Sequence, residues 1–257
     1  MAITLEREGR IGIIRLNTPP ANAYNEASLS ELAAAISEVG KDDAIRCATV
    51  ASGIEKFFCA GADISTLDGQ TTEGLAAFLA LAHEILDQME RTPKIFIAAI
   101  AGHCIGGGLE LALGCDLRIA SDGGYRLGLG EVNLGLSPGM GGTQRLARQI
   151  APGKALHMMV SGEMVSPGEA LELGIVEWLY PADKHWDEVM AYAGKLADGP
   201  TMAQGYIKLS MKGGLGGNLA DGLVLERENQ LILSQSEDAG EGIKAFLEKR
   251  KAAFKGR

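Results

Sequence analysis

Hydrophobic residues in the first part of the chain alternate between short continuous runs and helical spacing. Ile11–Leu16 and Ala44–Ala51 are short apolar runs that predict strands, and Leu29–Ile36 between them carries apolar residues at helical spacing. Ser28–Glu31 is a possible capping box at the start of this helix. The pattern therefore predicts a strand, a helix and a second strand in this order.

The same order is repeated in the next part of the chain. Leu75–Met89 has the spacing of an amphipathic helix, which should end at Thr92 and Pro93. The apolar run Pro93–Cys104 predicts a buried strand, and the glycines of Gly106–Gly108 then lead into a new helical pattern. Alternating strands and helices of this kind predict an α/β fold.

The last part of the chain is predominantly helical. Ser166 is expected to cap a short helix with Pro167 at its first position and Glu169 completing the capping box, and Gly174 should end it. A helix over 144–151, a strand over 175–180 and helices over 187–197, 201–211, 219–235 and 237–254 are also predicted. No internal repeat of fixed period and no low-complexity linker divides the chain.

Composition and charge narrow the function classes. The 257 residues are 46% hydrophobic and 22% charged, which is typical of a soluble globular protein with a substantial core. No run approaches the roughly 18 apolar residues of a membrane span, and the acidic N-terminus does not resemble a signal peptide, so we expect a cytoplasmic protein with no membrane partner. A net charge of −9 argues against nucleic acid as a partner.

The cysteines and histidines do not suggest a metal or a disulfide framework. Cys47, Cys59, Cys104 and Cys115 lie in apolar segments without CxxC spacing, so we expect buried thiols. The run that begins at His83 approaches H-E-x-x-H but lacks the second histidine. We therefore predict no metal site.

The stretch from Pro93 to Arg145 carries the candidate chemistry. Glu110 lies in the first turn of the helix that follows Gly106–Gly108, where backbone N–H groups lack intrahelical partners, and Glu131 follows a second glycine-rich turn. Two carboxylates in one desolvated pocket favour an acid and base pair. The alternative is that each Glu merely interacts with a helix dipole.

Other catalytic motifs fail on specific residues. The glycine-rich segments miss the third glycine of G-x-G-x-x-G, and no G-K-[ST] is present. The run Gly135–Gly139 matches G-x-S-x-G, but Pro138 after the serine has no N–H for an oxyanion hole. A nicotinamide dehydrogenase therefore remains a distant alternative, and a serine hydrolase is rejected.

Several blocks together resemble the crotonase superfamily, and within it the enoyl-CoA hydratases. The blocks are FFCAGADI at Phe57–Ile64, the run Lys94–Ser121 with its IGGGLELALGCD core, and GEVNLGLSPGMGGTQRL at Gly130–Leu146. SPGEALELGIV and the terminal SEDAGEGIKAFLEKRKAAF extend the resemblance over nearly the whole chain.

The resemblance implies a fold and an assembly that periodicity alone does not predict. It implies a spiral core of repeated ββα turns over 1–195, which would hold the coenzyme A and catalytic sites. A helical region over 196–257 would support oligomerisation as homotrimers or dimers of trimers. Coenzyme A would enter only as part of the acyl-CoA thioester substrate, with no permanently bound cofactor, and the metabolism would be fatty acid β-oxidation.

The resemblance also implies roles for individual residues. The N–H groups of Ala62 and Gly107 would form an oxyanion hole for the thioester carbonyl. Glu110 would be the base that deprotonates water and Glu131 the acid that protonates C2, with the two roles exchangeable, while Gly139 would steady the water.

The cofactor path and the acyl pocket follow the same resemblance. Ala60, Asp63 and Ile64 would line the coenzyme A path, and Ser65 stands where many relatives carry a lysine. Leu67, Leu75 and Phe78 are candidates for the acyl pocket wall, although the sequence does not specify the acyl group.

Two alternative functions compete with that of a hydratase. A Δ3,Δ2-enoyl-CoA isomerase, or another crotonase, would move protons without adding water, whereas a pair of glutamates favours hydration. A non-catalytic scaffold with the same fold would need neither Glu110 and Glu131 nor the two glycine-flanked donors.

Overall fold

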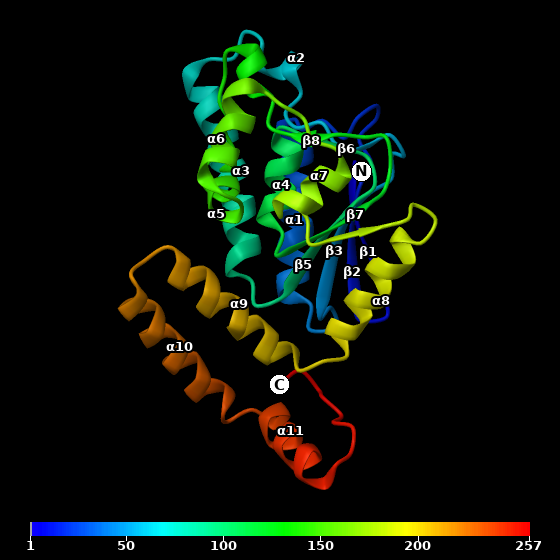
Figure 1. The fold of residues 1–257 in the computed structure, drawn as a ribbon, viewed down its shortest axis with the longest axis vertical. Helices are drawn as coiled ribbons and strands as arrows, with labels where there is room; N and C mark the ends of the chain where they lie inside the picture. Colours follow the sequence, from blue (N-terminus) through cyan, green and yellow to red (C-terminus); the bar gives the residue numbers. More distant parts are fainter. Residues whose placement is uncertain (1) are drawn as a thin grey trace.

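Two β-sheets and eleven α-helices make up residues 2–257, the part of the chain that the computed structural model describes (Figure 1). The strands are β1 (Ile3–Glu8), β2 (Ile11–Leu16), β3 (Cys47–Ser52), β4 (Phe57–Cys59), β5 (Ile95–Ile100), β6 (His103–Ile105), β7 (Leu117–Ser121), β8 (Leu127–Gly128) and β9 (Trp178–Tyr180). The helices are α1 (Glu26–Lys41), α2 (Ile64–Leu67), α3 (Thr72–Arg91), α4 (Gly107–Gly114), α5 (Gly142–Gln149), α6 (Pro152–Ser161), α7 (Pro167–Leu173), α8 (His185–Ala197), α9 (Thr201–Leu215), α10 (Leu219–Leu233) and α11 (Glu237–Glu248), with a 3₁₀ turn η1 (Glu131–Leu134).

The two sheets are built by a spiral of strand pairs. The larger sheet has the order β1-β2-β3-β5-β7-β9, in which only β1 and β2 are antiparallel, and the smaller sheet has the order β4-β6-β8 with all strands parallel. Successive pairs β3/β4, β5/β6 and β7/β8 each place one strand in the larger sheet and the next in the smaller. The expected α/β class and the ββα spiral are confirmed.

Both faces of the larger sheet are covered, which explains why its strands are continuous apolar runs. Ile14 and Leu16 of β2 face the main core beside α1, α3 and α4, whereas Ile11 and Ile13 face a second core beneath α8. Successive side chains of a strand point to opposite faces. A strand buried on both faces therefore lacks the alternating polar residues of a strand with one face in solvent. Figure 1 shows α8 on one side of the sheet and α1 and α4 on the other.

Several predicted elements are confirmed at their ends. The amphipathic helix over 75–89 is part of α3, whose cap is Thr92, directly before Pro93. Helix α7 has the predicted Ser166 cap with Glu169 in a reciprocal capping box, and it ends at Gly174 in the left-handed conformation. These helix ends could be predicted from the sequence because the residues that specify them lie within the helix or directly beside it.

Other predictions were wrong. Helix α1 begins three residues earlier than the proposed box, because Asn25 is the cap and the Ser28 hydroxyl accepts a hydrogen bond from the Asn25 N–H. The run Pro93–Cys104 forms two strands, because the chain crosses between sheets at Gly102, where a side chain would collide with the backbone of Lys56. Strands β1 and β7 and helix α6 were not predicted, and α11 ends at Glu248 instead of residue 254.

The expectation of buried thiols is confirmed. All four cysteines are buried and none forms a disulfide. Burial raises the pKa of Cys47, Cys59 and Cys115 to about 12. No helix of residues 2–257 is long and apolar enough to cross a membrane.

A buried ion pair joins the C-terminal helices to the core. Lys208 of α9 is only 4% exposed, and its Nζ lies 2.8 Å from Asp116 Oδ2 while also donating to the carbonyls of Met89 and Lys94. Beyond this contact α9 and α10 lie side by side and α11 follows at the end of the molecule opposite α2 (Figure 1). The pair therefore fixes the direction in which this helical region leaves the core.

Replacing Lys208 with Met should lower the free energy of unfolding by about 3–5 kcal/mol, because Asp116 would remain buried without its cation. Urea unfolding at fixed protein concentration measures the change. Lys212→Met, one turn further along α9, is the matched control and should change stability by less than about 0.5 kcal/mol. A Lys208→Met protein as stable as this control would contradict the assigned role of the pair.

Candidate active site

A cavity of about 370 Å³ lies at the carboxyl ends of the three strands of the smaller sheet. The segments that follow β4, β6 and β8 all reach it, as expected for parallel strands that end at one edge. Its lining residues are Ala60, Ala62, Ile64, Leu75, Phe78, Leu79, Ile105, Gly106, Gly107, Glu110, Gly130, Glu131, Leu134, Leu136, Ser137, Gly139, Met140 and Met164. Apart from the two glutamates, the lining is almost entirely uncharged.

Glycines allow the backbones around the cavity to approach each other. Gly61 has φ +88°, and a Cβ there would lie 2.7 Å from the nitrogen of Gly107. Gly108 faces the Cys59 carbonyl so closely that any side chain would overlap it. The start of α4 can therefore lie directly against the end of β4 only because these positions are glycine.

Two backbone N–H groups meet at this contact. An added Cβ on Gly107 would lie 3.6 Å from the nitrogen of Ala62, so the two donors are neighbours. Among the hydrogen bonds of residues 2–257, neither N–H has an acceptor, and that of Gly107 is in the first turn of α4. The pair can receive an oxygen that carries negative charge.

Glu110 lies in the first turn of α4 and is 1% exposed. Its Oε1 accepts hydrogen bonds from Met140 N at 2.8 Å and Gly142 N at 2.6 Å. Burial raises the pKa of Glu110 to about 7, the nearby Glu131 carboxylate also raises it, and the two N–H donors and Arg145 act in the opposite direction. Glu110 can therefore exchange a proton near neutral pH.

Glu131 is the first residue of the 3₁₀ turn after β8, and its carboxylate lies beside Gly106 in the cavity lining. A Cβ on Gly106 would lie 3.0 Å from Glu131 Oε1, so the absence of a side chain leaves room for the carboxylate. Burial raises the pKa of Glu131, and its Oε2 is buried without a hydrogen-bond partner among the residues that the structure describes. A buried oxygen of this kind needs a partner, which a bound water or substrate could supply.

Gly139 borders the cavity between Ser137 and Met140. Its carbonyl accepts a hydrogen bond from His83 Nε2 at 2.7 Å, and its own N–H donates to no acceptor among residues 2–257. Leu79 lies against it, because a Cβ at this position would be 2.8 Å from Leu79 Cδ2. The free N–H therefore remains available to a ligand.

The residues predicted for the coenzyme A path separate into two groups. Ala60 and Ile64 line the cavity. Asp63 instead caps α2, and its Oδ1 accepts from both the backbone N–H and the hydroxyl of Ser65, the latter at 2.7 Å. Asp63 and Ser65 thus fix the start of the short helix α2, and neither is part of the cavity lining.

The cavity has apolar walls that the sequence did not specify. Leu75 and Phe78 line it as expected, whereas the side chain of Leu67 lies outside the described residues. Leu79, Met140 and Met164 also line it without having been predicted. No local signal identifies Met164, which comes from the loop between α6 and α7 and packs on Gly128 and Gly130.

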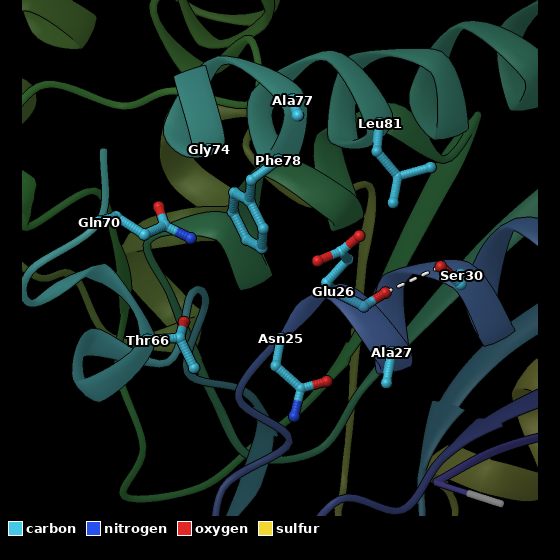
Figure 2. A pocket seen from close by; sticks show the side chains of 10 residues that line it. All are labelled: Asn25, Glu26, Ala27, Ser30, Thr66, Gln70, Gly74, Ala77, Phe78 and Leu81. Carbon is cyan, nitrogen blue, oxygen red and sulfur yellow. Dashed lines mark hydrogen bonds between the residues drawn. The ribbon is translucent and has the colours of Figure 1, made fainter. Parts of the chain in front are cut away.

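A second pocket lies on the other side of Phe78, between the start of α1 and α3. Figure 2 shows Glu26, Gln70 and Phe78 around it, with Glu26 bound through its backbone carbonyl to Ser30. Phe78 is 6% exposed and lines both cavities, so its ring separates them. The second pocket lacks a pair of carboxylates, which makes it the weaker candidate for catalysis.

The basic residues of the C-terminal segment pair mainly with acids of the same segment. Arg250 contacts Glu241 and Glu248, and Lys255 and Arg257 contact Glu237. This segment and α2 are at opposite ends of the molecule (Figure 1). Within residues 2–257, no group of three or more His, Cys, Asp or Glu could hold a metal ion.

Comparisons with known proteins agree on one family. The enoyl-CoA hydratase/isomerase model matches residues 6–257. A probable enoyl-CoA hydratase of Rhizobium meliloti is 38% identical over 256 residues, covering 99% of this chain and 98% of the relative. A crotonyl-CoA hydratase of Syntrophomonas wolfei is 33% identical over 253 residues, covering 98% and 97%. An enoyl-CoA hydratase structure from Geobacillus kaustophilus is similar with a TM-score of 0.97 at 41% identity, covering 100% and 97%.

The raised pKa of Glu110 predicts a pH-dependent stability. Relative to the ordinary value of 4.5, a folded-state pKa of about 7 means that the contribution of Glu110 to stability is fully present below pH 4.5 and is lost as the pH rises to about 7. Glu110→Gln should remove this loss and gain about 1–3 kcal/mol at pH 8, where wild-type Glu110 is charged.

Urea unfolding at pH 5 and pH 8 tests this expectation. The exposed Glu84→Gln on α3 serves as the control and should leave the pH dependence unchanged. If Glu110→Gln were less stable than wild type at pH 8, the buried charge of Glu110 would not be the main factor that lowers the free energy of unfolding at this pH.

Proposed function

Because the chain belongs to the enoyl-CoA hydratase/isomerase family, we propose that it hydrates trans-2-enoyl-CoA thioesters to 3-hydroxyacyl-CoA. The observation that carries the proposal is the arrangement at one cavity of two glutamates and a pair of unbonded N–H donors. Glu110 and Glu131 both have raised pKa values, and Ala62 and Gly107 present the donors. Addition of water to a conjugated thioester needs both features.

The N–H groups of Ala62 and Gly107 would bind the thioester oxygen. When hydroxide adds to C3, the electrons of the double bond move toward the carbonyl and the thioester becomes an enolate. Donors fixed by the backbone stabilise this charge without having to reorient, and each such donor typically contributes roughly 100 to 1,000-fold in rate. The contact between α4 and β4 supplies this rigidity.

Glu110 is proposed as the base and Glu131 as the acid. Hydrogen bonds from Met140 N and Gly142 N favour the anion of Glu110, whereas Oε2 of Glu131 has no donor and can carry a proton. The pair would hold one proton in common near neutral pH. Glu110 takes a proton from water, the hydroxyl bonds to C3, and Glu131 gives its proton to C2, so one water is added.

Gly139 would orient that water through its N–H group, which has no protein acceptor within residues 2–257. Water placed between Gly139, Glu110 and Glu131 would reach C3 from the side of the carboxylates. An isomerase moves a proton within its substrate and needs no such water site. The donor at Gly139 and the second carboxylate therefore favour hydration over isomerisation.

The substrate would enter past Ala60 and Ile64, with coenzyme A as part of the thioester. The acyl group would lie against Leu75, Phe78 and Leu79. One relative is named a crotonyl-CoA hydratase, so crotonyl-CoA is a suitable first substrate.

The C-terminal region over 196–257 is proposed as the oligomerisation region of a homotrimer or a dimer of trimers. Large apolar side chains on α9, α10 and α11 are exposed in the single chain, including Leu219 at 77% and Phe246 at 83%. Soluble monomers rarely expose contiguous apolar surface of this extent. Copies of the same chain, with core domains over 1–195 facing outward, would cover it.

Purified protein should consume crotonyl-CoA, measured as loss of the conjugated-enoyl absorbance. Glu110→Gln and Glu131→Gln should each lower kcat by about 100 to 10,000-fold, because each removes one proton-transfer group while preserving shape. The exposed Glu84→Gln should retain full activity. Near-normal turnover in either active-site variant would refute the assigned pair, and coenzyme A binding without turnover in the wild type would favour isomerase chemistry.

Sedimentation velocity should give a mass three or six times the 27.0 kDa of one chain. Leu219→Glu and Phe246→Glu should shift the protein toward monomer, because each places a charge in the proposed apolar interface. Leu171→Glu on α7 is a control that should not change the mass. A wild-type monomer at micromolar concentration would refute the proposed assembly.

A further inference from the structure

The segment from Pro138 to Gly142 is held from two opposite sides. On the cavity side, the N–H groups of Met140 and Gly142 donate to Glu110 Oε1. On the other side, His83 Nε2 donates to the carbonyl of Gly139 at 2.7 Å. The Gly139 carbonyl and the Met140 N–H belong to one peptide group, so a single rigid plane joins His83 to Glu110.

Arg145 of α5 makes the corresponding contact to the next peptide group. Its Nη1 donates to the carbonyl of Met140 at 3.1 Å, and its guanidinium lies so close to Gly141 that a side chain there would overlap it. Gly141 has φ +102°, which glycine adopts readily. The peptide that follows carries the Gly142 N–H, whose bond to Glu110 is the shorter of the two at 2.6 Å.

Arg145 is itself fixed by acids of α3. Its Nε donates to Glu90 Oε1 at 2.8 Å, and its Nη2 lies 3.8 Å from Asp87. The side chain is only 18% exposed. A guanidinium held by a carboxylate on one side can position a carbonyl on the other, because its donors form a planar fork.

We propose that Arg145 is a positioning residue for Glu110, and that His83 assists it by holding the adjacent peptide group. The inference rests on the proposed hydratase function of Glu110. Neither side chain lines the reaction cavity. Both act through backbone carbonyls, which aim the N–H groups of Met140 and Gly142 at the carboxylate that is to receive the proton of water.

Two physical effects follow from this arrangement. Hydrogen bonds to the carbonyls of Gly139 and Met140 restrict the segment, and donation from His83 to the Gly139 carbonyl polarises the Met140 N–H of the same peptide group. The positive charge of Arg145 also favours the anion of Glu110, consistent with its lowering effect on the pKa. Loss of Arg145 should therefore disturb both the position of Glu110 and its proton affinity.

Other charged groups face the same region and define the controls. A cavity of about 390 Å³ behind the segment is bordered by side chains from four helices, α3, α4, α5 and α9. Its titratable and charged residues are His83, Asp87 and Glu90 of α3, Arg145 and Arg148 of α5, and Lys212 of α9. Arg148 has the same chemistry as Arg145 but donates only to Gln144, so it is the matched control.

The test compares Arg145→Met, Arg145→Lys and Arg148→Met by their kcat, KM and pH profiles with crotonyl-CoA. Arg145→Met should lower kcat by about 10 to 100-fold with little change in KM, because a misplaced base slows the reaction more than binding. The alkaline limb of kcat/KM, where the shared proton leaves the glutamate pair, should move to higher pH by about 0.5 to 1 unit, since a favourable positive charge is lost. Arg148→Met should match the wild type.

The conservative variant separates charge from geometry. Arg145→Lys keeps the positive charge but loses the planar fork, so the pH profile should return to that of the wild type while kcat stays below it. His83→Leu should lower kcat by about 3 to 10-fold, as expected for one lost hydrogen bond, and His83→Gln, which keeps an N–H donor, should recover part of it. This second pair tests the inference even if Arg145→Met does not fold.

A direct titration of Glu110 keeps this inference distinct from the proposed function. With ¹³C-labelled glutamate, and the Glu110 signal assigned by its loss in Glu110→Gln, NMR should show proton release at higher pH in Arg145→Met than in wild type and Arg148→Met. If crotonyl-CoA is not hydrated but this shift appears, the hydratase proposal fails and the positioning role stands. If the Glu110 titration is unshifted in Arg145→Met, and kcat is unchanged in Arg145→Met and His83→Leu, the positioning role is refuted.

Discussion

The direct contact between the start of α4 and the end of β4 is the constraint on which the rest of the site depends. Gly108 lies against the Cys59 carbonyl with no room for a side chain, and this closeness places the free N–H groups of Ala62 and Gly107 beside each other. The same contact fixes the first turn of α4, and with it Glu110. The spiral of strand pairs is what delivers both backbones to one edge of the smaller sheet.

Backbone N–H groups, not side-chain cations, provide the direct hydrogen bonds to the Glu110 carboxylate. Glu110 is buried, no cation of residues 2–257 forms an ion pair with it, and its hydrogen-bond donors are two amides of the segment that follows Pro138. The guanidinium of Arg145 acts from further away, through the carbonyl of Met140. This arrangement keeps the carboxylate basic enough to exchange a proton, whereas a direct ion pair would hold it as a permanent anion.

The sequence predicted those features whose causes are local or are confined to one stretch of chain. The caps of α7, the end of α3 at Thr92, and the placement of Glu110 after a glycine cluster all depend on residues a few positions apart. Features created by tertiary contact were missed, among them the crossing between β5 and β6. Arg145 and Met164 had no local signal either, because what each contacts is decided by packing between distant segments.

The burial of Cys59 has a consequence for a protein proposed to handle thioesters. Cys59 precedes the candidate oxyanion hole by three residues, and its Sγ lies 3.3 Å from the nitrogen of Gly61. A thiolate there could exchange with a bound thioester and trap the acyl group on the protein. With its pKa raised to about 12, only roughly one thiol in 100,000 would ionise at pH 7. Burial thus keeps the Cys59 thiol protonated, so it would not compete with water for a bound thioester.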